Sequence, residues 1–198
     1  MTLDRFYPIF DSAAWIRRGL SCGVKLVQLR IKDASPETIR AEIEASRDLC
    51  RAAGAVLVVN DHWQAAIETG CDWVHLGQED LDDADTHAIR KAGINLGIST
   101  HDVAERERAL ALRPDYIALG PIYPTILKKM KWAEQGLGRI TEWKDAIGDI
   151  PLVAIGGMSI ARAAGAFAAG ADIVAAVTDI TLNAAPEARM GAWIEATR

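Results

Sequence analysis

The chain has 198 residues, half of them apolar, and a net charge of −5. This length and apolar content suit one well-buried domain over residues 1–198, because no linker or low-complexity segment interrupts the chain. Acidic and basic residues are interspersed and no apolar run is long enough to span a bilayer, so neither a nucleic-acid groove nor a membrane segment is expected.

Eight apolar segments rich in strand-forming residues alternate with stretches of helical periodicity. They span 6–10, 24–30, 56–60, 73–77, 95–99, 116–121, 152–156 and 173–178. Eight such units predict an α/β fold, a compact (β/α)8 TIM barrel. That fold builds its active site at the C-terminal ends of the strands, so we look for functional residues there.

The second segment continues into a polar stretch. Strand side chains alternate between two faces, so an apolar set can pack against helices while a polar set points into the barrel mouth. Polar groups buried there are costly unless they bind something, which predicts a ligand site. In the alternative, this is an edge strand in which Lys32 pairs with Asp33. The polar set is Gln28, Arg30 and Lys32, and the apolar set is Val27, Leu29 and Ile31.

Carboxylates follow the third and fourth segments. Asp61 comes directly after the third, and Asp80 lies shortly after the fourth. Neighbouring strands lie roughly 5 Å apart, so the two carboxylates can share one cation. A site that leaves room for water and substrate phosphate oxygens is typical of Mg²⁺. Alternatively, Asp61 caps the next helix and Asp80 is a solvated loop acid.

Polar residues also follow the fifth and sixth segments. Ser99 either extends the arc of ligand-binding groups or caps the helix that starts near Val103. After the sixth segment, Lys128 belongs to a cationic stretch that either is a solvated loop or closes as a lid over a bound anion. His75, inside the fourth segment between Val74 and Leu76, is predicted to be a hydrogen-bonded core histidine.

The last two segments end in features suited to a phosphate. Gly156 and Gly157 follow the seventh, and Thr178 ends the eighth. In TIM barrels these loops often hold a phosphate through backbone N–H groups, although a Gly-Gly pair can also serve only to turn the chain. Together with the metal and cation arc, this predicts two anion sites at one barrel mouth. An enzyme that joins two phosphorylated molecules would need both.

The chain resembles thiamine phosphate synthases over most of its length. The resembling stretches are 28–32, 59–61, 72–80, 97–101, 115–125, 153–157 and 170–180. The resemblance implies an Mg²⁺-dependent enzyme that condenses hydroxymethylpyrimidine diphosphate with a thiazole phosphate or its carboxylated form. It releases pyrophosphate and thiamine phosphate. The partners are these small molecules, with an assembly of identical subunits as an open alternative.

The resemblance also implies roles for individual residues. Metal ligands fall on Asp61 and Asp80, and catalytic contacts with the leaving diphosphate fall on Arg30, Lys32, Lys128 and Ser99. The pyrimidine diphosphate site comprises Gln28, Leu29, Arg30, Ile31, Lys32, Asn60, Ser99 and Lys128. The thiazole phosphate site comprises Thr125, Gly157, Val177 and Thr178.

Three departures and two rivals accompany the resemblance. One departure is the first segment, which differs from the family's usual opening. Leu127 stands where the family usually has a hydroxyl, and Thr178 stands where serine is common. A related thiazole tautomerase would place a histidine after the sixth segment, where this chain has Gly120 and Pro121. A non-catalytic sensor of thiamine precursors would have little need for leaving-group chemistry.

The three cysteines also bear on location. Cys22, Cys50 and Cys71 are an odd number without metal-ligand spacing. This pattern favours buried, inert thiols in a reducing compartment, in line with the cytoplasm.

Overall fold

The computed structural model describes residues 3–125 and 132–198. Over these residues eight parallel strands pair in chain order, and β8 pairs with β1 to close a barrel. The predicted (β/α)8 TIM barrel is therefore confirmed. The strands are β1 (Phe6–Phe10), β2 (Leu26–Leu29), β3 (Val56–Asn60), β4 (Trp73–Leu76), β5 (Asn95–Thr100), β6 (Tyr116–Leu119), β7 (Leu152–Ala154) and β8 (Ile173–Ala176).

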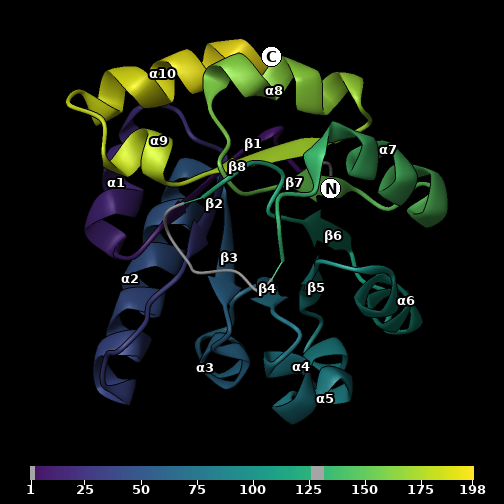
Figure 1. Ribbon diagram of the computed structural model, residues 1–198. Helices are drawn as coiled ribbons and strands as arrows, with labels where there is room; N and C mark the ends of the chain where they lie inside the picture. The colour runs from purple at the N-terminus through teal and green to yellow at the C-terminus, as the bar shows by residue number, and fades with distance from the viewer. Residues whose placement is uncertain (1–2, 126–131) are drawn as a thin grey trace.

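Helices surround the ring of strands, as Figure 1 shows. In the described part of the chain they are α1 (Ala13–Ser21), α2 (Pro36–Ala53), α3 (Trp63–Thr69), α4 (Asp80–Asp83), α5 (Thr86–Lys91), α6 (Val103–Ala111), α7 (Gly136–Ile147), α8 (Ile160–Ala168), α9 (Thr178–Thr181) and α10 (Pro186–Thr197). Among them, no helix is long and apolar enough to cross a membrane.

The core has two parts because strand side chains alternate between the faces of the sheet. One part fills the barrel, and the other lies between the strands and the helices. On β2, Leu26 belongs to the inner part, while Val27 and Leu29 belong to the outer part, followed by Ile31. The predicted outward face of this segment is thus confirmed, and Gln28 is buried on the opposite face.

Local sequence signals explain several helix ends. The Ser35 hydroxyl accepts the Thr38 N–H at the start of α2, and Gly54 ends that helix in a left-handed conformation. Asp85 and Asp102 accept backbone N–H groups at the starts of α5 and α6. Such caps satisfy backbone donors that lack a partner within the helix.

Several strands are shorter than their apolar runs predicted. β2 ends at Leu29, and β7 ends at Ala154, two residues before the predicted end.

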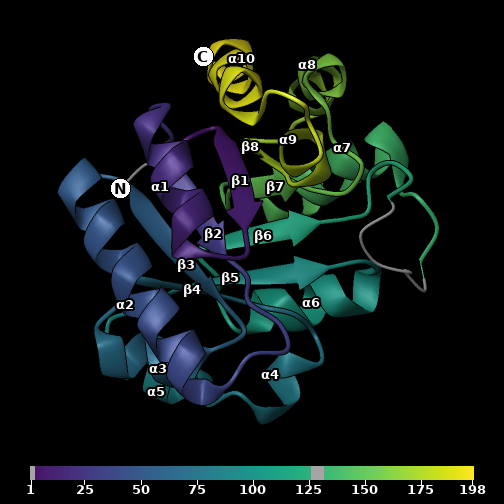
Figure 2. The same ribbon diagram turned by 90° about the vertical axis from the view of Figure 1, so that its left-hand side faces the viewer.

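In Figure 2 the arrowheads of β5 and β6 point to the same end of the barrel. Because parallel strands all point this way, the residues beyond their ends gather at one mouth. At this mouth, the polar side chains of those residues can contact a ligand.

Candidate active site

Charged residues meet at the ends of β2, β3 and β4. Arg30 and Lys32 follow β2, Asp61 follows β3, and Asp80 is the first residue of α4. The Lys32 ammonium pairs with the Asp61 carboxylate, and the alternative pair with Asp33 is not formed. Asp61 is largely buried while half of the Lys32 side chain is exposed. A cation thus stands next to a predicted metal ligand, open to the barrel mouth.

Asp61 has an unusual backbone conformation. Its φ of 63° lies in the left-handed region, which costs a residue with a Cβ about 1 kcal/mol. The Asp61 N–H donates to the His75 carbonyl at 2.9 Å, which ties the end of β3 to β4. His62, not Asp61, occupies the cap position of α3, so the capping alternative is wrong. Strain of this kind tends to collect at functional sites.

Asp80 is held by the turn that precedes α4. The Gly77 N–H donates to Asp80 Oδ2 at 3.1 Å, and a Cβ on Gly77 would lie only 2.9 Å from that oxygen. Burial raises the pKa of the Asp80 carboxyl, and the charge of Asp61 and a hydrogen bond to it raise that pKa further. The two carboxyls are therefore close neighbours that repel each other when both are ionised.

These two carboxyls fit a hard divalent cation. Within residues 3–125 and 132–198, no group of three or more His, Cys, Asp or Glu side chains could hold an ion by itself. A pair of oxygen ligands with further positions left to water and phosphate is how proteins usually hold Mg²⁺. A cation held by Asp61 and Asp80 would also offset the repulsion that adds to the effect of burial on the pKa of Asp80.

Inside the barrel, five side chains form one hydrogen-bonded chain. Gln28 Nε2 donates to the Tyr7 hydroxyl at 2.9 Å, and the Tyr7 and Tyr116 hydroxyls lie 3.0 Å apart. The Tyr116 hydroxyl lies 2.8 Å from His75 Nδ1, and His75 Nε2 lies 2.7 Å from Ser99 Oγ. The first four residues are buried, and Ser99 is partly exposed. The chain therefore runs from the buried interior to the mouth.

His75 is a buried core histidine with hydrogen bonds on both ring nitrogens, as predicted. Burial lowers its pKa to about 4; Asp61 opposes this shift, while Arg30 and His101 add to it. At neutral pH the ring is therefore uncharged. One ring nitrogen then carries a proton and donates, and the other accepts.

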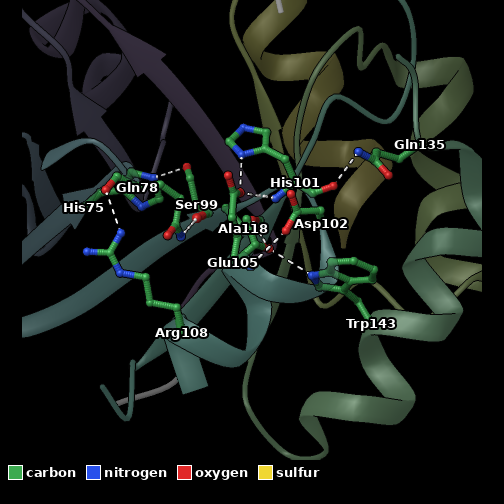
Figure 3. Close-up of polar contacts among 11 residues, drawn as sticks. His75, Gln78, Ser99, His101, Asp102, Glu105, Arg108, Ala118, Gln135 and Trp143 are labelled. Carbon is green, nitrogen blue, oxygen red and sulfur yellow. Dashed lines mark hydrogen bonds and ion pairs between the residues drawn. The ribbon is translucent and has the colours of Figure 1, made fainter. Parts of the chain in front are cut away.

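Figure 3 shows how the neighbours of Ser99 are arranged. Gln78 Nε2 donates to the Ser99 carbonyl at 2.7 Å, while Gln78 Oε1 is buried without a partner among the described residues. The cap of α6 is Asp102, whose Oδ1 accepts the Glu105 N–H at 2.9 Å. The helix-cap alternative for Ser99 is thus wrong, and its hydroxyl contacts His75 instead.

His101 joins the loop after β5 to the residues before α7. Its Nδ1 lies 2.7 Å from a Glu105 oxygen, and its carbonyl accepts Gln135 Nε2 at 2.7 Å (Figure 3). Its ring stacks on that of Trp132, with centroids 4.1 Å apart. Leu127, Lys128, Lys129 and Lys131, and with them the lid prediction, lie outside the described residues.

The ends of β7 and β8 carry the predicted phosphate residues. Gly157 has a φ of 62°, and a Cβ there would lie 2.4 Å from the Pro124 carbonyl oxygen. Only glycine lets this loop approach the one that carries Thr125. Thr178 begins the short helix α9, directly after Val177. Backbone N–H groups at a helix start and a glycine turn favour anions.

The other predicted site residues lie on the same strands. Asn60 is buried at the end of β3, opposite His75 of β4. Leu29 and Ile31 have side chains in the outer core, so they can offer a ligand only their backbone. The partly buried Val177 packs against the inner core.

Sequence reasoning missed two tyrosines, Tyr7 and Tyr116, which link Gln28 to His75 by hydrogen bonds. Tyr7 and Tyr116 lie within apolar strands, where they read as ordinary core residues. The available signal was alternation, which puts Tyr7 on the inner face of β1 between the outward-facing Phe6 and Pro8.

Comparisons with known proteins point to one family. The family described as thiamine monophosphate synthase matches residues 6–180. A thiamine-phosphate synthase of Rhizobium etli is 55% identical over 197 residues, covering 100% of this chain and 97% of the relative. One from Escherichia coli (strain K12) is 48% identical over 175 residues, covering 88% of this chain and 83% of the relative.

The solved structures show a shared fold. A thiamine phosphate pyrophosphorylase from Pyrococcus furiosus superposes with a TM-score of 0.87 at 24% identity, covering 98% of this chain and 95% of that chain. A 3-hexulose-6-phosphate synthase reaches a TM-score of 0.71 at 14% identity, covering 98% of this chain and 100% of that chain. The match over residues 6–180 and the identity to the curated relatives place this chain in the thiamine monophosphate synthase family.

Proposed function

We propose that this chain condenses hydroxymethylpyrimidine diphosphate with a thiazole phosphate to give thiamine phosphate and pyrophosphate. Its relatives carry the name of this activity. The observation that supports it most strongly is the meeting of Arg30 and Lys32 with Asp61 and Asp80 at the mouth of the barrel. Cations beside a carboxylate pair suit a metal-bound diphosphate better than a neutral substrate.

In the proposed reaction, the bond between the pyrimidine methylene and the diphosphate oxygen breaks, and its electron pair leaves with pyrophosphate. The thiazole nitrogen then donates its lone pair to the resulting carbocation, forming the new carbon–nitrogen bond. No proton is transferred, so neither a general base nor a covalent nucleophile is required. The main task of the protein is to bind both substrates and stabilise the charge that develops on the leaving group.

The leaving group would be bound by residues from several strand ends. Arg30, Lys32 and Lys128 supply positive charge, and Ser99 supplies a hydroxyl. Asp61 and Asp80 would hold Mg²⁺, which when bound supplies further positive charge to the diphosphate. Because Lys32 pairs with Asp61, the ammonium is already positioned next to the proposed metal ligands.

The organic parts of the substrates would lie deeper and to either side. The pyrimidine would contact the side chains of Gln28 and Asn60 and the backbone of Leu29 and Ile31. The thiazole phosphate would be bound by Thr125, Gly157, Val177 and Thr178. Their positions around β6, β7 and β8 support a second anion site beside the first.

The rivals are less well supported. A tautomerase would need a proton-transferring histidine after β6, and Gly120 and Pro121 occupy that place. A sensor without catalysis would not need two neighbouring carboxyls, Asp61 and Asp80, beside the cations at the mouth.

We further propose that the protein works in the cytoplasm, alone or as an assembly of identical subunits. The three cysteines are free, and Cys50 and Cys71 are buried. Burial raises the pKa of the Cys50 thiol to about 12, which makes it unreactive at neutral pH.

The test is to incubate purified protein with both phosphorylated precursors and Mg²⁺ and to analyse the products by mass spectrometry. Thiamine phosphate and pyrophosphate should appear in equal amounts, and omitting either precursor should abolish thiamine phosphate. No thiamine phosphate from the complete mixture, or isomerisation of the thiazole alone, would refute the proposal.

A further inference from the structure

The hydrogen-bonded chain inside the barrel has a direction. At one end, the Gln28 amide nitrogen can only donate, and it donates to the Tyr7 oxygen. Among the described residues, the oxygen of Tyr116 is the one acceptor recorded within reach of the Tyr7 proton. Tyr7 therefore donates to Tyr116, and Tyr116 in turn donates to His75 Nδ1.

This direction selects one form of the neutral histidine. A ring whose Nδ1 accepts must carry its proton on Nε2. That Nε2–H then donates to Ser99 Oγ, 2.7 Å away. The opposite direction would leave the Tyr7 proton buried without an acceptor, which disfavours it by roughly tenfold to a hundredfold.

We propose that His75 is a positioning residue: in its Nε2–H form it donates to Ser99 Oγ and so directs the Ser99 proton toward an acceptor on the bound substrate. The inference rests on the proposed function in one respect, that Ser99 contacts the diphosphate substrate. A hydroxyl that already accepts from His75 is oriented before the substrate arrives. An anionic phosphate oxygen is the acceptor best suited to such a proton.

The barrel is built to accommodate this contact. His75 of β4 lies opposite Gly97 of β5, which in turn lies opposite Tyr116 of β6. A Cβ on Gly97 would lie 2.1 Å from Tyr116 Cζ. Because Gly97 has no side chain, the Tyr116 ring crosses β5 and stacks on the His75 ring, with centroids 5.5 Å apart and planes 11° apart.

The first experiment observes the proton directly in the wild-type protein. Long-range ¹H–¹⁵N NMR distinguishes protonated from unprotonated ring nitrogens, and the His75 signals are identified by their loss in His75→Gln. We expect Nε2 to be protonated and Nδ1 to be unprotonated at neutral pH. Protonation of Nδ1 would overturn the proposal, whatever activity the enzyme has.

The second experiment tests whether the hydrogen bonds from Tyr116 to His75 affect catalysis through Ser99. Tyr116→Phe removes the hydroxyl that donates to His75 Nδ1, so Ser99 is no longer oriented. We expect kcat/KM for the pyrimidine diphosphate to fall about tenfold, the loss of roughly one hydrogen bond to a charged group. In a Ser99→Ala background, the same substitution should cause no further loss.

Thr100→Val is the matched control. The buried Thr100 hydroxyl donates to the Ala118 carbonyl and accepts from Trp143 Nε1, and it takes no part in the hydrogen bonds that lead to Ser99. This variant should lose stability and keep its kcat/KM. Equal losses from Tyr116→Phe with and without Ser99 would mean that Tyr116 is merely structural, which overturns the proposal. A wild-type protein that makes no thiamine phosphate but has Nε2 protonated would instead refute the proposed function.

Discussion

Acidification should destabilise this protein through His75 in particular. The pKa of the buried ring falls from 6.5 to about 4, chiefly because burial disfavours the charged form. In the unfolded chain, the His75 ring therefore binds a proton below about pH 6.5. In the folded chain, it binds this proton only below about pH 4. The stabilisation is complete above pH 6.5 and is lost as the pH falls. Since each tenfold change in proton affinity is worth about 1.4 kcal/mol, the loss attributable to His75 is about 3 kcal/mol.

The assay is urea unfolding at pH values from 7 to 4, followed by tryptophan fluorescence. His75→Gln removes the titrating group, so the stability of the wild type relative to this variant should fall by about 3 kcal/mol across the range. His87 is exposed on α5, and His87→Gln should follow the wild type. Parallel curves for wild type and His75→Gln would refute the reasoning, because they would mean that His75 binds protons equally in both states.

Three further predictions concern the mouth and the wall of the barrel. Asp80→Asn should raise the melting temperature of the metal-free protein at neutral pH, because the ionised carboxyl of Asp80, whose pKa is raised in the fold, destabilises the folded state. Added Mg²⁺ should raise the melting temperature of the wild type and not that of the variant. Thr178→Ala should raise the KM for thiazole phosphate about tenfold, while Thr141→Ala on α7, whose hydroxyl donates to the Ala169 carbonyl at the end of α8, should leave it unchanged. Gly97→Ala should displace Tyr116, lowering both stability and kcat/KM, and unchanged stability would contradict the 2.1 Å approach.

The sequence was sufficient to predict the barrel because strand periodicity is local. Each apolar run carries its own alternation, and Leu29 and Gln28 fall on opposite faces as that alternation requires. The strand ends were less accurate, because apolar residues such as Ile155 continue beyond the last residue of β7, Ala154. Placement of Asp61 and Asp80 near each other followed from strand order alone.

Partners that lie far apart in sequence could not be predicted in this way. The local alternative pairs Lys32 with its neighbour Asp33, yet the pairing of β2 with β3 brings it to Asp61. The sequence leaves Ser99 either as a ligand-binding hydroxyl or as a helix cap, and gives no sign that this hydroxyl contacts His75 from the adjacent strand. The pairing of Tyr7 with Tyr116 depends on contact across the closed interior, which no local pattern reports.

The central claim is that the carboxyl pair and the cations at the mouth serve a metal-assisted departure of pyrophosphate. The most direct measurement is the Mg²⁺ dependence of pyrophosphate release in wild type, Asp61→Asn and Asp80→Asn, with Asp82→Asn as the control. Asp82 is exposed and pairs with Arg108 on the surface. We predict losses of at least a hundredfold in the first two variants at limiting Mg²⁺ and wild-type behaviour in the control. Near-normal release by both Asp61→Asn and Asp80→Asn at limiting Mg²⁺ would contradict the claim.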